Sequence, residues 1–184
     1  MDQDEALFCR FLSGEEDALR TLMDRYGNRL TLYISGIICD LHDAEDLMLE
    51  AFSRIIFKRP KLVEHGFKPY LFKIGRNLAL RYLGRNRLHR HFGLEDMGQE
   101  AEATELVETI VQSGEQSRIL RDCMCKLPPD YREVLYLLYF EDLSYAQAAQ
   151  IMKKNEKQIT NLAYRGKQAM RPILEREGIT HAQY

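Results

Sequence analysis

The segment SYAQAAQIMKKNEKQITNLAYRGK, residues 144–167, carries the clearest structural pattern in the chain. Ser144 followed by Gln147 is a capping box, in which each side chain accepts a hydrogen bond from a backbone N–H of the first helical turn. Asn155 and Gln158 repeat this spacing, so a second helix is expected to begin there. The first helix is short and rich in alanine, which lets another helix pack closely against it. The pattern therefore predicts a helix-turn-helix.

The second of these helices has two chemically different faces. Its inner face is apolar at helical spacing, through Ile159, Ala163, Met170 and Leu174. The opposite face is polar and basic, through Lys157, Thr160, Asn161, Tyr164, Arg165, Lys167 and Arg171. Arg and Asn can donate hydrogen bonds to base edges and Lys to phosphates, so this helix suits a DNA major groove. An ordinary surface helix of a bundle is the alternative.

Working outward, apolar residues recur at helical spacing through almost the whole chain. No run of alternating, β-branched residues predicts a strand, so the fold class is all-α. The expected further helices span approximately residues 7–12, 15–37, 44–60, 68–91, 119–127 and 128–140.

Charge is segregated along the chain, although the net charge is only -2. Acidic residues prevail before Ser53, and basic residues prevail from Arg54 to His91. A basic block beside acidic ones indicates an anionic polymer on one surface and a different partner on another, although a solvated face also explains a single charge run.

The segment 93–117 is acidic, contains neither Lys nor Arg, and is punctuated by glycine. It is typical of a linker, in which residues 101–111 are compatible with a short helix. We therefore expect two small helical bundles, residues 1–92 and residues 118–184, joined by a flexible acidic linker.

The four cysteines lack the spacing of a zinc site and the density of a disulfide scaffold. We expect buried or half-buried thiols, no metal site and no cofactor. The cysteines are Cys9, Cys39, Cys123 and Cys125.

Three stretches of the second half, LPPDYR at 127–132, DLSYAQAA at 142–149 and YRGK at 164–167, resemble the fourth conserved region of sigma-70-family factors. That resemblance implies recognition of the -35 promoter element. The implied contacts, with Lys157 added from the same polar face, are Lys157, Thr160, Asn161, Tyr164, Arg165 and Lys167. The chain departs from the family pattern at Lys153-Lys154 and at residues 160–162, so we expect the family's docking mode but not its usual -35 sequence.

Upstream, the stretch DAEDLMLEAF at 43–52 is similar to the sigma region-two helix that docks on the clamp coiled coil of the polymerase β′ subunit. The outward residues expected to bind core polymerase are Asp43, Asp46, Leu49, Glu50 and Ser53. An acidic face with an exposed leucine suits a partly basic helical partner, and a solvated acidic face is the alternative.

The stretch FKPYLFKIGRNLAL at 67–80 resembles the family's helix for promoter melting and -10 recognition. Opening a duplex requires a basic surface for the displaced strand and pockets for unstacked bases. The candidates for this DNA contact are Lys61, His65, Lys68, Lys73, Arg76, Asn77, Arg81 and Arg85. Among them, the resemblance assigns Asn77 to a flipped base.

Both motif sets occur in the family's order, so the chain is identified as resembling the small, two-domain extracytoplasmic-function (ECF) sigma factors. The resemblance implies a specificity subunit with no catalytic residues of its own. Its implied partners are core RNA polymerase, through the β′ clamp helices and the β flap, promoter DNA, and an anti-sigma factor of the kind that many relatives have.

Two other classes are less well supported by the sequence. A stand-alone helix-turn-helix regulator would bind duplex DNA unaided and would not need Asp46 and Glu50. An enzyme is disfavoured, because there is no phosphate-binding glycine loop, no zincin spacing and no nucleophile with a recognisable partner. No stretch approaches the roughly 18 apolar residues of a membrane span, and the amino terminus does not resemble a signal peptide, so we expect a cytoplasmic protein without membrane insertion.

Overall fold

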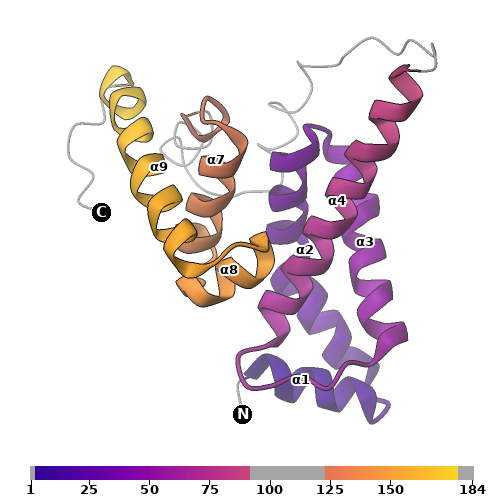
Figure 1. Ribbon diagram of the computed structural model, residues 1–184. Coiled ribbons are helices and arrows are strands. Elements are labelled where there is room, and N and C mark those ends of the chain that lie inside the picture. Colours follow the sequence, from indigo (N-terminus) through magenta and orange to yellow (C-terminus); the bar gives the residue numbers. More distant parts are fainter. Residues whose placement is uncertain (1–2, 92–122, 178–184) are drawn as a thin grey trace. The chain divides into compact units, whose positions relative to one another are not determined.

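The computed structural model describes residues 3–91 and 123–177. The chain divides into two compact units, Met1–Leu106 and Val107–Tyr184. All regular elements in the described ranges are helices, which confirms the all-α fold class (Figure 1). The linker expected over 93–117, with the short helix inside it, lies outside the described residues, so the domain boundaries stay a prediction. None of the described helices combines the length and the apolar composition that a membrane span needs.

Four helices build the first unit, and α2 packs against each of the other three. They are α1 (Gln3–Leu12), α2 (Glu16–Ile38), α3 (Leu41–Lys58) and α4 (Phe67–His91). Aromatic rings fill much of the space between them: the ring centroid of Phe67 lies 5.6 Å from that of Phe8 and 5.9 Å from that of Tyr26. Tyr33 and Phe72 pair in the same way at 5.2 Å. Such tilted pairs add to the stabilisation that burial alone provides.

The break between α2 and α3 is made by local backbone chemistry. Cys39 adopts a left-handed conformation with φ 59°, and its N–H donates to the carbonyl of Ser35 at 2.8 Å, which ends α2. Asp40 then caps α3, because its side chain accepts a hydrogen bond from the N–H of Asp43 at 2.9 Å. Arg59, at φ 44°, ends α3 in the same way as Cys39 ends α2.

Helix α4 approaches α2 closely at a glycine. A Cβ on Gly75 would lie 2.8 Å from Cδ1 of Leu30 and 3.3 Å from Cδ1 of Ile34. Because only glycine permits this approach, Gly75 fixes which side of α4 is packed and which side remains outward.

The first helix begins earlier than the sequence indicated. We expected it to start at residue 7, but α1 begins at Gln3 and buries two acids, Asp4 and Glu5, at 8% and 4% exposure. The Asp4 carboxylate accepts hydrogen bonds from the side chains of Arg25 and Tyr26 of α2. Burial, and then the hydrogen bond to Asp4, raise the pKa of Tyr26. The expectation was wrong because acids at an amino terminus are usually solvated, whereas these two have partners on other helices.

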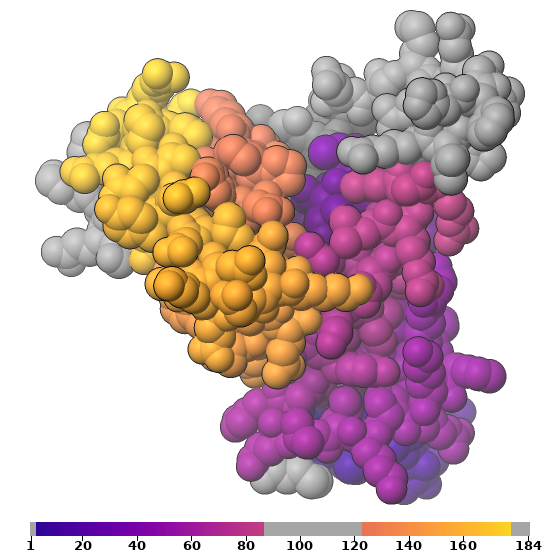
Figure 2. All heavy atoms as spheres, in the orientation of Figure 1, coloured from indigo at the N-terminus to yellow at the C-terminus, as the bar shows by residue number. Residues whose placement is uncertain are grey.

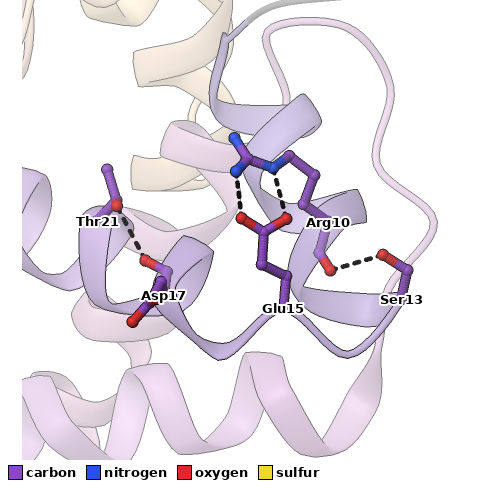
Figure 3. A network of polar contacts seen from close by, with 5 residues as sticks. All are labelled: Arg10, Ser13, Glu15, Asp17 and Thr21. Atoms are coloured by element: carbon purple, nitrogen blue, oxygen red, sulfur yellow. Dashed lines mark hydrogen bonds and ion pairs between the residues drawn. The ribbon is translucent and has the colours of Figure 1, made fainter.

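The turn from α1 to α2 is tied by exposed polar contacts (Figure 3). The guanidinium of Arg10 pairs with the carboxylate of Glu15, with one Nε to Oε2 distance of 2.8 Å. The hydroxyl of Ser13 donates to the carbonyl of Arg10 at 2.8 Å, and that of Thr21 donates to the carbonyl of Asp17 at 2.9 Å. This network orients the chain as it enters α2.

In the described part of the second unit, helical residues 123–125 precede α7 (Pro129–Leu135), the π-helix η1 (Tyr136–Phe140), α8 (Tyr145–Met152) and α9 (Glu156–Arg176). The helix expected over 128–140 therefore changes character after Leu135. A Cβ on Gly166 of α9 would lie 3.2 Å from Cγ of Leu135, so α7 and α9 also meet at a glycine.

The expectation of buried or half-buried thiols holds for only one cysteine. Cys123 is buried, whereas Cys9, Cys39 and Cys125 are exposed. The expectation failed for the other three cysteines because each exposed thiol lies on an outer helix face or at a helix end, and apolar periodicity does not identify such positions.

Candidate functional site

The helix-turn-helix forms with both of its expected capping boxes. The N–H of Gln147 donates to Oγ of Ser144 at 3.2 Å, and the N–H of Ser144 donates to Oε1 of Gln147 at 2.9 Å. At α9, Asn155 and Gln158 exchange the same pair of hydrogen bonds at 2.8 and 2.9 Å. Lys153 makes the turn in a left-handed conformation with φ 55°. These bonds fix where α9 begins and hence which of its residues point outward.

Helix α9 separates its apolar and polar residues on opposite sides. Its buried residues are Ile159, Ala163, Gly166, Met170 and Leu174. All six residues expected to contact the -35 element are exposed, namely Lys157, Thr160, Asn161, Tyr164, Arg165 and Lys167. Tyr164 is 66% exposed, so its ring lies free of the packed interior. Atoms of α8 and α9, in orange to yellow, make up much of the face of this unit that Figure 2 shows.

Two of these six side chains are already engaged within the unit. Nζ of Lys167 lies 4.6 Å from the ring centroid of Tyr139, which is a cation–π distance. The hydroxyl of Thr160 donates to the carbonyl of Glu156 at 2.9 Å. Tyr139 is joined by Tyr145, whose pKa is raised by burial and then by its hydrogen bond with Tyr139. Sequence reasoning missed both tyrosines, of which Tyr139 belongs to the π-helix and Tyr145 begins α8.

Helix α4 presents four of the expected -10 contacts as one row. Lys73, Asn77, Arg81 and Arg85 are four residues apart and lie along one side of the helix. Arg81 and Arg85 are exposed, whereas Lys73 and Asn77 are half-buried. This row is the outer face of α4, opposite the side that Gly75 packs against α2.

The remaining -10 candidates lie elsewhere. Lys61 and His65 are exposed in the connection between α3 and α4. Lys68 is half-buried and precedes Asn77 by two and a half turns, so the two point to opposite sides of α4. Arg76 is only 9% exposed and lies within the packed unit.

Two aromatic residues near the start of α4 also differ in their burial. Phe72 is fully buried and belongs to the core of the first unit, whereas Tyr70 is half-buried.

Two of the three acids on the α3 face expected to bind core polymerase have partners within the first unit. Asp46, Leu49 and Ser53 are exposed. The carboxylate of Asp43 accepts a hydrogen bond from the hydroxyl of Tyr82 on α4. Burial, and then this bond, raise the pKa of Tyr82.

The second acid of that face with a partner is Glu50. Its Oε1 accepts hydrogen bonds from Nε and a terminal nitrogen of Arg54 at 3.0 and 2.7 Å. Arg54 offsets the charge of Glu50, whereas Tyr82 is a neutral hydrogen-bond donor and brings no positive charge to Asp43.

Beyond this face lies an exposed aromatic residue that sequence reasoning missed. Phe57 is 90% exposed near the end of α3, and Val63, in the following connection, is 76% exposed. Phe57 follows Ser53 by four residues and Leu49 by eight, and this spacing was the available signal. In the described residues, no group of three or more His, Cys, Asp or Glu side chains could hold a metal ion.

Comparison with family models gives two matches in succession. The model described as Sigma-70 region 2 matches residues 22–89, and the model described as Sigma-70, region 4 matches residues 117–170. The first match covers α3 and most of α4, and the second covers the helix-turn-helix.

Two curated relatives resemble the chain over more than four fifths of their length. The ECF RNA polymerase sigma factor SigM of Bacillus subtilis is 28% identical over 155 residues, which are 82% of this chain and 91% of the relative. The ECF RNA polymerase sigma-E factor of Haemophilus influenzae is 30% identical over 162 residues, which are 81% of this chain and 83% of the relative.

Solved structures show a similar fold at lower identity. CnrH, solved in complex with the cytosolic domain of CnrY, has a TM-score of 0.65 at 19% identity, covering 95% of this chain and 99% of that one. The sigma factor RpoE of Bartonella quintana, solved with the anti-sigma factor NepR, has a TM-score of 0.64 at 19% identity, covering 85% and 96%.

Proposed function

The chain belongs to the extracytoplasmic-function group of the sigma-70 family of RNA polymerase sigma factors, and we propose that its two units divide the family's work between them. Sigma factors are DNA-binding transcription initiation factors. In this proposal the first unit binds core RNA polymerase through α3 and captures the melted -10 element through α4. The second unit reads the -35 duplex through α9 and contacts the β flap.

The observation that carries the proposal is the division of α9 into a buried and an exposed side. Five apolar or small residues of α9 are buried, while every residue expected to contact the -35 element is exposed. A helix with Asn161, Tyr164 and Arg165 outward can enter a major groove and offer donors to base edges. Lys157 lies at the amino-terminal end of the same side, where it suits a phosphate.

Thr160 and Lys167 have supporting roles in this proposal. The hydroxyl of Thr160 bonds to its own helix, so it can accept but does not freely donate a hydrogen bond to DNA. Lys167 lies over the ring of Tyr139, which holds its charge beside α9 in a position to meet a phosphate.

The outer row of α4 is the proposed -10 surface. Lys73, Arg81 and Arg85 supply positive charge along one side, and Asn77 in the same row is placed to hydrogen bond with an unstacked base. Strand capture supplies the free energy for melting, so no catalytic group, cofactor or nucleotide hydrolysis is required. Arg76 is assigned to support of the fold, because it is buried.

A gel shift with promoter DNA, with and without core polymerase, tests this division. We expect weak binding by the isolated chain and specific binding by the chain with core polymerase. Replacing Asp46 and Glu50 with lysine should abolish the core-dependent shift. Tight, specific binding without core polymerase, unaffected by these substitutions, would instead indicate a stand-alone regulator, which the comparisons do not favour.

Placement in the cell and regulation extend the proposal. A factor that works with core polymerase acts in the cytoplasm, and we propose this location for the chain. An anti-sigma factor stays a prediction, since the solved complexes share only the fold with this chain.

A further inference from the structure

The outward side of α3 carries a ridge that extends beyond the residues assigned above to core binding. Residues four apart on a helix form one ridge along its surface. In α3 this ridge, here called the α3 ridge, consists of Glu45, Leu49, Ser53 and Phe57, and all four are exposed. Leu49 is 48% and Phe57 90% exposed. Eight residues separate them, or about 12 Å along the helix axis.

The residue in the middle of the α3 ridge, Ser53, projects little from the helix, and its hydroxyl needs no hydrogen-bond partner from another molecule. Ser53 has a small side chain, and its hydroxyl already donates to the carbonyl of Leu49 at 2.9 Å. Two large apolar side chains two turns apart, with a small residue between them, match the groove and ridge of a second helix.

Charge changes sign along the α3 ridge. Glu45 and Asp46 are exposed at its amino-terminal end, and Lys58 and Arg59 are exposed directly after Phe57. In the part of the chain that the structure describes, none of these four charged side chains forms an ion pair. A partner helix that is basic at one end and acidic at the other would form favourable contacts with the α3 ridge in one orientation only.

We propose that Phe57 is the apolar anchor of the contact with core RNA polymerase, and that the α3 ridge binds one polymerase helix lengthwise. The basic end of that helix lies beside Glu45 and Asp46. Its acidic end lies beside Lys58 and Arg59. The inference rests on the proposed function and deepens it, because it adds an anchor and a direction to the core-binding contact.

A single DNA strand suits the α3 ridge less well than a helix does. The basic residues Lys58 and Arg59 would attract the phosphates of such a strand, and the ring of Phe57 could stack on a nucleobase. The acids at the other end of the same ridge would repel that strand. A protein helix with a charge gradient satisfies both ends.

The test measures binding of the full chain to immobilised core polymerase in the absence of DNA. F57A should raise the Kd by about 10- to 100-fold, as truncation of an aromatic anchor does. V63A is the matched control, because Val63 is also a largely exposed apolar residue but lies outside α3, and its Kd should stay at the wild-type value. Thermal melting of F57A should match the wild type, since the side chain is 90% exposed.

Charge reversal tests the direction of the partner helix. The double variants E45K/D46K and K58E/R59E should each weaken binding, and both effects should shrink as salt rises. If only the second variant has an effect, the proposed gradient is wrong.

The outcomes separate this inference from the proposed function. If the wild type binds core polymerase and F57A binds equally well, the anchor is refuted. Loss of promoter melting alone in F57A would assign the ring to the DNA strand, and loss of self-association alone would assign it to a second copy of the chain. Failure of the wild type to bind core polymerase would refute the proposed function itself, and this inference with it.

Discussion

Replacing Glu5 with alanine should destabilise the first unit, because a buried carboxylate of α1 holds the first turn of α4. Oε1 of Glu5 accepts a hydrogen bond from the backbone N–H of Phe67 at 2.8 Å, and Glu5 is only 4% exposed. A hydrogen bond to a charged group contributes about 1.5–3 kcal/mol, and its loss leaves a buried N–H unsatisfied. We therefore expect E5A to cost about 2–3 kcal/mol, a change of about 30- to 150-fold in the unfolding equilibrium.

Glutamine at the same position should cost less. E5Q keeps an acceptor for the N–H of Phe67, but its amide nitrogen would occupy the place of Oε2, which is buried without a hydrogen-bond partner in the described structure. An intermediate loss of about 1–2 kcal/mol is expected. E16A is the control, because Glu16 is an exposed acid in the first turn of α2 and its loss should cost about 0.5 kcal/mol or less.

Urea unfolding of the full chain, followed by far-UV circular dichroism, measures these differences. With a slope of about 2 kcal/mol per M, a loss of 2 kcal/mol lowers the urea midpoint of the first unit by about 1 M. The transition of the second unit is an internal reference and should stay in place. An E5A protein with both midpoints unchanged would show that Glu5 does not hold α4.

Three further predictions concern the helix caps, the tyrosines and pH. N155A removes the side chain that caps α9 and should lower the stability of the second unit by about 1 kcal/mol in the same urea assay; an unchanged midpoint would contradict this. Y139L removes the ring 4.6 Å from Nζ of Lys167, so binding of the -35 element by the holoenzyme should weaken about 2- to 5-fold in a gel shift, and equal affinity would count against this contact. Burial raises the pKa of Tyr26 and of Tyr82 above the ordinary 10.0. Above that pH the unfolded chain loses phenolic protons that the folded chain keeps, so the stability of the first unit should fall as the pH rises further. Y26F should make this fall shallower in urea midpoints measured across that pH range, and identical slopes would refute the assignment.

Local interactions made much of this fold predictable from the sequence. Both capping boxes join residues only three apart, so Ser144 with Gln147 and Asn155 with Gln158 could be recognised in the sequence. The apolar side of α9 follows from helical periodicity alone, and so the exposed side could also be assigned.

Contacts between distant residues were not predictable in the same way. The hydrogen bond from Tyr82 to Asp43 spans 39 residues, and the one from Phe67 to Glu5 spans 62. Composition marks such acids as surface charges, because nothing in their neighbourhood reveals a partner on another helix. The partners of Asp43 and Glu5 could therefore be found only in the folded structure.

Periodicity also fails where a residue lies at the border of a face. Arg76 is next to Asn77 in the sequence, yet one is buried and the other is half-buried on the outer row of α4. Phe57 was left unassigned for a different reason, since a large aromatic residue in solvent is uncommon and composition alone does not point to it.

The π-helix at Tyr136–Phe140 accommodates one residue more per turn than an α-helix does, as the hydrogen bond from the N–H of Glu141 to the carbonyl of Tyr136 shows. An inserted residue leaves such a bulge when both ends of a helix are held in place. Deleting one residue here would restore an ordinary helix and turn the segments on either side by about 100° relative to each other. Tyr139 would then move away from Lys167, so a change in chain length outside the helix-turn-helix would alter the surface that meets DNA.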